Sequence, residues 1–407
     1  MSNHAPRLSG HRLAEIARNF GTPVYVYHAE RIAFQYARLR SAFEACDPLF
    51  FYACKSLTNI NILKYVRSLG ACLDCVSINE VMLGLKAGFL PEQILFTPNC
   101  TDLDEYIAAK ELGVHLNIDS LPILEKFGNR FGNSYPVCIR LNPHIMAGGN
   151  LKISTGHADS KFGISIQQAD QLLDLVSRTG IRVAGIHMHT GSDIKDVDVF
   201  LEGLQVMLDM SRHFNELRFI DLGSGFKVPY KEGDPQTDIE TLGFRLSAAM
   251  KAHETATGRK LRIWFEPGKF LVSECGYLIV KANIVKETPA RVFVGVNSGF
   301  NHLIRPMFYD AYHHIVNISN PEGPECTYNV VGNICETDTF AWDRKLNEVR
   351  EGDFLVFLNA GAYGFEMSSN FNSRLKPAEV LVMDDEPKLI RRREGFADLL
   401  RGQVEVL

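Results

Sequence analysis

Over its first two thirds, the chain alternates short apolar runs with amphipathic segments. Eight runs have the length and composition of buried strands, and they cover residues 50–54, 72–76, 94–98, 114–118, 137–141, 183–188, 217–222 and 262–267. The segments between them, such as 79–89 and 167–180, place apolar residues at helical spacing and contain glycine near their ends. This alternation predicts a (β/α)8 TIM-like barrel, an α/β fold whose active site forms at the carboxyl ends of the strands.

After Gly268 the pattern changes to strand-like runs without long helices between them. These runs cover residues 277–287, 290–298, 328–335, 353–363 and 378–385, and they predict a second, mainly β domain. The early run 22–28 leads directly into the first helical segment, so we expect it to join the sheet of the second domain. We therefore expect a barrel over residues 29–272 and a C-terminal β domain over residues 273–407, which the N-terminal segment 1–28 joins.

Composition and charge narrow the class of protein. The chain has 407 residues, of which 46% are hydrophobic and 22% charged, as is typical of a globular protein with two domains. A net charge of -5 gives no general attraction to nucleic acid or to an anionic membrane. No apolar run approaches the length of a membrane span, and the N-terminus lacks the apolar core of a signal peptide. We expect a cytoplasmic protein with no membrane or nucleic-acid partner.

The nine cysteines are an odd number and lie mostly inside apolar runs, which is typical of free thiols in a reducing compartment. Cys72 and Cys75 form one C-x-x-C pair within a strand-like run, and no second pair accompanies it. Packing is therefore favoured over zinc binding or redox chemistry for this pair.

Lys55 stands where the first barrel run ends, in "FFYACKSLTN". A lysine at a strand end is ordinarily a solvated charge whose methylene stem covers apolar surface. In a barrel, however, the strand ends converge on one mouth, so Lys55 would point into a shared cavity. A desolvated lysine can capture an aldehyde as an imine, and pyridoxal phosphate is the obvious aldehyde. That cofactor also requires phosphate contacts, a flat group against its ring and a partner for its ring nitrogen.

Phosphate contacts are offered by "DLGSGF", where Gly223 and Gly225 would let backbone N–H groups approach an anion, and by the hydroxyl of Ser192. A lone G-x-G suits a tight strand-to-helix turn about as well. Its position after the seventh run favours the phosphate, because the loops after strands seven and eight are the usual phosphate site of such barrels.

"GIHMHTGS" places His187 and His189 two apart on a predicted strand, so both imidazoles face the same side. Such a pair also suits a zinc-dependent barrel hydrolase, although no further ligands at the other strand ends complete the coordination. We interpret His189 as the flat group on the pyridine ring and His187 as a core histidine. Glu266, in "FEPGKF", would keep the ring nitrogen protonated, which favours decarboxylation over racemisation.

One family shares, in the same joint order, the stretches "GTPVYVYH", "YACKSLTN", "STGHADSKFGI", "GIHMHTGSDI", "DLGSGF", "EPGKF", "HLIRPMFYDAYHHI", "GNICETDTF" and "GAYGFEMSSNFNSRLKPAEVLV". The chain resembles the fold-type III pyridoxal-phosphate decarboxylases, and among them the branch that acts on diaminopimelate. The resemblance implies an alanine racemase/ornithine decarboxylase-like barrel and β domain, pyridoxal 5'-phosphate as cofactor and no metal. The implied reaction converts meso-2,6-diaminopimelate to L-lysine and CO2 in the last step of lysine biosynthesis.

The resemblance also implies roles for individual residues. The catalytic residues are Lys55, which forms the imine, and Cys335, which protonates the carbanion. The cofactor contacts are Asp74 near the imine, His189 on the ring, Glu266 at the ring nitrogen, and Ser192, Gly223, Ser224, Gly225 and Tyr363 around the phosphate. The substrate contacts are Lys269, Arg305, Tyr309 and Tyr363 at carboxylate groups and Glu336 at the far ammonium. Members of this family are homodimers, with Cys335 and Glu336 entering the partner's barrel.

Two positions depart from the family's pattern. Ser224 stands where the family's "GGGF" has glycine, and Lys269 replaces the arginine of "EPGR", so a point charge replaces a bidentate contact. Other substrates remain open, namely carboxynorspermidine, ornithine or arginine, and carrier-bound glutamate. Diaminopimelate is favoured because ornithine has no far carboxylate for Arg305, Tyr309 and Lys269 to bind. From other classes, a zinc hydrolase and a non-catalytic cofactor-binding regulator remain, although a regulator would be expected to lose the imine lysine or the acid cysteine.

Overall fold

The computed structural model describes residues 7–145, 156 and 160–407. The chain divides into two compact units. The barrel unit comprises residues 35–228 and 235–270, and the β unit comprises the residues up to 34, residues 229–234 and residues 271–407. In the described part of the chain, no helix combines the length and the apolar character that crossing a membrane requires.

Parallel strands of the barrel unit pair in the order β5-β4-β3-β2-β10-β9-β8-β6, and the pairing of β5 with β6 closes the barrel. Their bounds are β2 Leu49–Ala53, β3 Cys72–Cys75, β4 Ile94–Phe96, β5 His115–Ile118, β6 Val137–Asn142, β8 Val183–His187, β9 Phe219–Asp221 and β10 Arg262–Phe265. A two-residue strand, β7 (Ile164–Ser165), pairs with β6. The barrel predicted from the apolar runs is confirmed.

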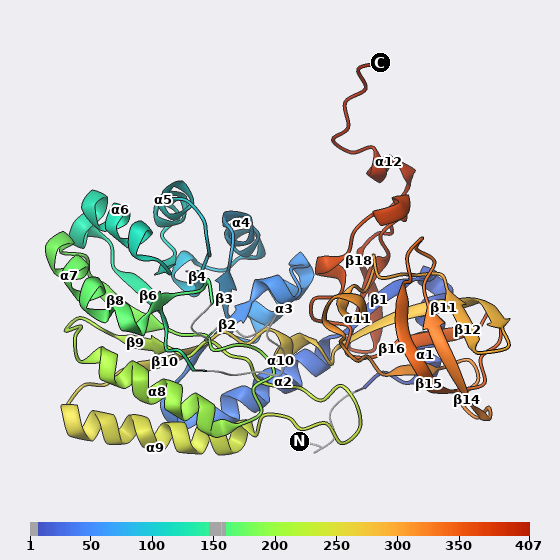
Figure 1. Cartoon of the computed structure of the whole chain (residues 1–407), viewed down its shortest axis with the longest axis horizontal. Coiled ribbons are helices and arrows are strands. Elements are labelled where there is room, and N and C mark those ends of the chain that lie inside the picture. The colour runs from blue at the N-terminus through green and yellow to red at the C-terminus, as the bar shows by residue number, and fades with distance from the viewer. Residues whose placement is uncertain (1–6, 146–155, 157–159) are drawn as a thin grey trace. The chain divides into compact units, whose positions relative to one another are not determined.

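Helices alternate with these strands and cover the outside of the barrel, as α8 and α9 do in Figure 1. Their bounds are α2 Ala29–Phe43, α3 Ile60–Ser68, α4 Ile78–Ala87, α5 Leu103–Glu111, α6 Leu121–Phe131, α7 Ala169–Thr179, α8 Val197–Ser211 and α9 Ile239–Thr257. Local signals set the helix ends. In α4, the hydroxyl of Ser77 accepts the N–H of Glu80, and Gly88 ends the helix at a φ of 96°.

The barrel interior has an apolar layer and a polar layer, because alternate residues of a strand face the same side. The apolar cluster contains Phe51, Cys72, Leu95, Cys138, Phe219 and Trp264, and the rings of Phe219 and Trp264 stack with centroids 3.4 Å apart. Two residues further along five of these strands stand Asp74, Thr97, Arg140, Asp221 and Glu266, all buried. The polar layer therefore lies next to the apolar cluster, on the side of the carboxyl ends of the strands, where the active sites of barrels form.

The β unit is built on a mostly antiparallel sheet in the order β15-β14-β12-β11-β1-β17-β18, to which β16 and β13 attach. The strand bounds are β1 Val24–His28, β11 Gly276–Glu287, β12 Val292–Val296, β13 Ile315–Asn317, β14 Glu325–Val331, β15 Thr339–Asn347, β16 Phe354–Phe357, β17 Ala378–Met383 and β18 Glu386–Arg391. Strand β1 lies between β11 and β17. Helix α1 (Gly10–Phe20) packs Leu13 and Ile16 against this sheet. Three short helices complete the chain, α10 Lys269–Val272, α11 Arg305–Tyr309 and α12 Phe396–Leu399.

Candidate active site

Lys55 lies in the 3-10 turn η2 (Cys54–Ser56), immediately after β2. The hydroxyl of Ser56 donates to the carbonyl of Ala53 at 2.7 Å, which tightens the turn. The Nζ of Lys55 is 3.2 Å from Oδ2 of Asp74. The lysine side chain is 42% exposed whereas the Asp74 side chain is fully buried. The ammonium therefore lies at the mouth of the barrel beside a carboxyl group that water does not reach.

The surroundings of Asp74 raise the pKa of its carboxyl group. Burial raises its pKa, and the nearby charge of Glu266 adds to this effect, while Lys55 opposes it, so that the pKa of Asp74 is about 7. Its other oxygen, Oδ1, has no hydrogen-bond partner among the described residues. Asp74 can therefore exchange a proton with Lys55 near neutral pH.

Glu266 follows β10 and is bound from two other strands. Its Oε2 is 3.2 Å from Nε2 of His187, and its Oε1 accepts the hydroxyl of Thr97 at 3.4 Å. Burial alone would raise the pKa of Glu266, but His187, Lys55 and His189 outweigh burial and lower the pKa to about 2. Burial lowers the pKa of His187, and a neutral imidazole can still donate from Nε2. Glu266 therefore remains a carboxylate deep in the barrel.

Two charged residues of the polar layer, Arg140 and Asp221, were not predicted from the sequence. Burial lowers the pKa of Arg140, while the charges of Glu266, Asp119 and Asp74 favour its charged form, so it is the counter-charge of the acidic layer. Burial raises the pKa of Asp221 well above its usual value. The signal that could have found both is a charged residue inside a buried strand run, since such a residue needs a partner.

The turn after β9 needs glycine at two positions. Gly223 and Gly225 have φ values of 61° and 104°. A Cβ on Gly223 would lie 2.6 Å from Nδ1 of His189, and a Cβ on Gly225 would lie 2.2 Å from the carbonyl oxygen of Gly191. Nδ1 of His189 accepts the N–H of Ser224 at 3.3 Å, which holds the imidazole against the turn. Burial lowers the pKa of His189 to about 3, so the ring is neutral at physiological pH.

The loop between β8 and α8 contains Ser192, which is half-buried, and Asp193. Oδ1 of Asp193 is 2.5 Å from Nζ of Lys269, and these side chains are 23% and 12% exposed. The positive charge of Lys269 is therefore shared with the carboxylate of Asp193. The sequence predicts Lys269 as a point charge for the substrate but does not predict this ion pair.

The β unit supplies a buried cation, Arg305, at the start of α11. Its Nη1 donates to the hydroxyl of Tyr230 at 3.1 Å and to the carbonyl of Ala362 at 3.2 Å, and its guanidinium lies 5.3 Å from the centre of the Tyr230 ring. Within the described chain, Nε of Arg305 has no hydrogen-bond partner and no carboxylate forms an ion pair with the residue. A buried guanidinium without a counter-charge suits an anionic ligand.

The other sequence-predicted residues of the β unit lie near its surface. Tyr309 is half-buried at the end of α11, and Tyr363 is half-buried with a φ of 57°. Cys335 is exposed in the segment between β14 and β15. Glu336, the next residue, lines a cavity of about 490 Å³ together with Phe300, Ile304, Met307, Phe308, Thr337, Ser369 and Phe371.

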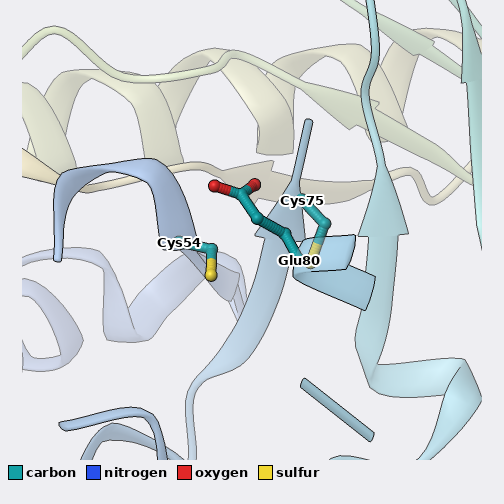
Figure 2. Close-up of side chains that lie close together, drawn as sticks. All are labelled: Cys54, Cys75 and Glu80. Atoms are coloured by element: carbon teal, nitrogen blue, oxygen red, sulfur yellow. The ribbon is translucent and has the colours of Figure 1, made fainter. Parts of the chain in front are cut away.

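Figure 2 shows a second cluster, in which Cys54 of η2, Cys75 of β3 and Glu80 of α4 lie close together. Burial raises the pKa of the Cys75 thiol well above its usual value, which disfavours the thiolate that a metal ion requires. The Glu80 carboxylate accepts the N–H of Val76 at 2.7 Å and so closes the start of α4. These three residues therefore act in packing and helix capping. Cys72, which forms the C-x-x-C pair with Cys75, belongs to the apolar cluster of the barrel interior.

The barrel-unit residues fit pyridoxal phosphate. Lys55 stands beside a buried carboxyl that can take its proton, and the glycine turn leaves no room for a Cβ where backbone N–H groups would meet a phosphate. A neutral imidazole, His189, lies against that turn, and an ionised carboxylate, Glu266, lies in the polar layer. This set covers the imine, the phosphate, the ring face and the ring nitrogen.

Comparison with known proteins agrees with a pyridoxal phosphate site in the barrel unit. A family model described as "Pyridoxal-dependent decarboxylase, pyridoxal binding domain" matches residues 29–273. A diaminopimelate decarboxylase of Methanothermobacter thermautotrophicus is 38% identical over 97% of this chain and 95% of its own length, and one of Aquifex aeolicus is 33% identical over 98% and 96%. The crystal structure of diaminopimelate decarboxylase from Helicobacter pylori complexed with L-lysine has a TM-score of 0.88 and 31% identity, covering 96% of this chain and 98% of that chain.

Proposed function

The chain belongs to the pyridoxal-dependent decarboxylases, and from this premise we propose that it converts meso-2,6-diaminopimelate to L-lysine and CO2, the last step of lysine biosynthesis. Its cofactor is pyridoxal 5'-phosphate. The observation that carries the proposal is the position of Lys55 at the barrel mouth, beside Asp74 and next to the layer that contains ionised Glu266. The relatives of nearly full length and the lysine-bound neighbour support this choice of substrate and product.

When bound, the cofactor supplies an aldehyde that condenses with amines and a ring that accepts the electron pair left by departing CO2. Lys55 would hold it, and Asp74, 3.2 Å away, would accept and return the proton of the lysine amine. Glu266 would keep a proton on the ring nitrogen, and His187 and Thr97 hold Glu266 in place for this task. His189 would lie on the ring face. Gly223, Ser224, Gly225, Ser192 and Tyr363 would bind the phosphate.

The far end of the substrate carries both a carboxylate and an ammonium, and these need different groups. We assign the far carboxylate to Arg305 and Tyr309, and this is supported by the buried guanidinium that lacks a carboxylate partner in the described chain. Lys269 would contribute a charge that it shares with Asp193, and Tyr363 a further contact. Glu336 would bind the far ammonium, because an opposite charge discriminates between substrates that carry this group and those that lack it.

We further propose a cytoplasmic homodimer in which Cys335 and Glu336 of one copy complete the site of the other. The free state of all nine cysteines supports the location. The cavity beside Glu336 supports the interface, because Met307, Phe308 and Phe371 line it and are 41%, 48% and 43% exposed. For the domains we propose a cofactor-binding barrel over residues 29–272 and a β domain formed by residues 273–407 with the N-terminal segment 1–28.

Direct assay tests the function. The purified protein, loaded with pyridoxal phosphate, is given meso-diaminopimelate, ornithine, arginine and carboxynorspermidine in parallel, and the amine product and CO2 are quantified. Meso-diaminopimelate should give the highest kcat/KM. A higher value for any of the other three would overturn the assignment of substrate while leaving the family unchanged.

A further inference from the structure

The segment that contains Cys335 is fixed from inside the β unit by Asp338. Oδ1 of Asp338 accepts the N–H of Phe300 at 2.7 Å, and Oδ2 accepts the N–H of Ile334 at 2.9 Å. Asp338 is 1% exposed, so these bonds are shielded from water. Although Cys335 itself is exposed, its backbone is therefore held in one position.

Asn372, in the 3-10 turn η8 (Phe371–Ser373), contacts Cys335 twice. The N–H of Cys335 donates to Oδ1 of Asn372 at 2.9 Å, and Nδ2 of Asn372 donates to Sγ of Cys335 at 3.1 Å. Chemistry fixes the orientation of the amide, since a backbone N–H can only donate and must face the oxygen. The NH2 group then faces the sulfur, so one amide binds both the backbone and the side chain of Cys335.

The turn that contains Asn372 is anchored to the same region of the β unit. The ring of Phe371 stacks on Phe300 with centroids 5.7 Å apart, and Nη2 of Arg374 donates to the carbonyl of Asn333 at 3.2 Å. Asn372 has a φ of 57°, a left-handed conformation that asparagine tolerates better than most residues. The amide therefore meets the sulfur from a second segment that is anchored to the segment of Cys335.

We propose that Asn372 is a positioning residue for proton delivery by Cys335, an inference that rests on the proposed function. Because the sulfur accepts a hydrogen bond from Asn372, the thiol hydrogen points elsewhere and is available to the substrate. In the transfer, the S–H bond breaks and a C–H bond forms with the electron pair on the carbon that lost CO2. The S–H electrons remain on sulfur as a thiolate, which later takes a proton from solvent. The amide N–H binds the thiolate more strongly than the thiol.

The reactivity of the thiol tests this inference without depending on turnover. Cys100 and Cys335 are the exposed cysteines, so the holoenzyme is studied in a Cys100→Ser background and alkylation of Cys335 by iodoacetamide is followed by mass spectrometry. Asn372→Asp retains an oxygen for the N–H of Cys335 but removes the donor to the sulfur. We expect alkylation of Cys335 to slow about tenfold, and kcat for lysine formation to fall about tenfold with KM unchanged.

Asn370→Ala is the matched control, because Nδ2 of Asn370 binds Arg374 and Glu394 in the same region. It should change both rates less than threefold, because these hydrogen bonds of Asn370 do not involve Cys335. If Asn372→Asp folds poorly, Asn372→Gly suits the left-handed backbone, removes both contacts and should slow alkylation as well. The inference would be overturned if Cys335 of the Asn372 variants were alkylated at the wild-type rate. It would also be overturned if Asn370→Ala slowed alkylation as much as the Asn372 variants do. A Cys335→Ala enzyme with wild-type kcat would refute the proposed proton donor, whereas the alkylation result would still decide the contact.

Discussion

Oδ1 of Asp193 lies 2.5 Å from Nζ of Lys269, and both side chains are largely withdrawn from water. The two residues are 76 positions apart and meet where the loop after β8 approaches the start of α10. An ion pair of this kind is not an independent anchor for a carboxylate, because an incoming anion competes with Asp193 for the same ammonium. Asp193 is therefore a candidate for tuning the substrate affinity that the sequence assigned to Lys269 alone.

We expect Asp193→Asn to lower the KM for meso-diaminopimelate about threefold to tenfold, since Lys269 would then offer its full charge to the substrate. Steady-state kinetics of decarboxylation measure the effect. Lys269→Met should raise KM. In the Lys269→Met background, adding Asp193→Asn should leave KM at this raised value. A KM that does not fall in Asp193→Asn would indicate that Lys269 does not contact the substrate.

Lys55→Ala should abolish both the visible absorbance of bound cofactor and nearly all turnover. Lys55 is the described lysine that pairs with a buried carboxyl of the barrel's polar layer, and alanine has no amine to replace it. Absorbance spectra before and after borohydride, together with lysine formation, give the readout. Lys64→Ala, at an exposed position of α3, is the control and should retain both properties. A Lys55→Ala protein that keeps absorbance and activity would refute the central assignment.

Asp74 gives a prediction about pH and stability in the absence of cofactor. Burial raises its folded-state pKa from 3.8 to about 7, so the unfolded chain releases this proton at lower pH than the folded protein. The stability that Asp74 contributes is thus fully present below about pH 4 and is lost as the pH rises through 7. Asp74→Asn should remove this loss, so its unfolding free energy should gain about 4 kcal/mol relative to the wild type as the pH rises from 4 to 8.

Urea unfolding of the apo-protein across that pH range measures the difference. Asp104→Asn, at an exposed position of α5, makes the same change in net charge and should leave the pH dependence of stability as it is in the wild type. A constant gap between Asp74→Asn and the wild type at all pH values would contradict the predicted titration.

Glu336→Gln tests the end of the substrate that has the far ammonium. A carboxylate facing that group contributes a few kcal/mol only to substrates that have it. We expect kcat/KM for meso-diaminopimelate to fall about tenfold or more. Glu322→Gln, in the exposed loop before β14, makes the same chemical change and should keep wild-type kinetics. Equal kinetics of the two variants would remove Glu336 from the substrate site.

The sequence predicts the barrel well because each of its strands is a buried parallel strand, and such strands are near-continuous apolar runs. Lys55 and Glu266 could be predicted because each directly follows the last apolar residue of such a run, Cys54 and Phe265 respectively. The bond between His187 and Glu266 could not be found, since it joins positions 79 apart through the closure of the barrel. Arg140 was missed for a related reason. Its charge lies inside a run, and the period of two shows which side it faces but not which carboxylates lie opposite.

Mixing two deficient variants distinguishes the proposed homodimer with shared sites from a chain whose barrel uses its own cysteine. If Cys335 acts in the partner's barrel, each site combines Lys55 of one copy with Cys335 of the other. Lys55→Ala chains and Cys335→Ala chains, each deficient alone, are mixed and allowed to exchange. Roughly half of the dimers should then be mixed, and in each of these one site has both lesions while the other has neither.

Lysine formation should therefore rise to roughly a quarter of the native sites at statistical exchange. Loss of Cys335 alone can leave decarboxylation with misdirected protonation, so the product measured must be lysine and the comparison must be with each variant by itself. Exchange is verified independently by mass spectrometry of differently tagged chains. Tagged chains that exchange without any gain in lysine formation would mean that each barrel uses its own cysteine, and the proposed interface would then have to be abandoned even if the protein is dimeric.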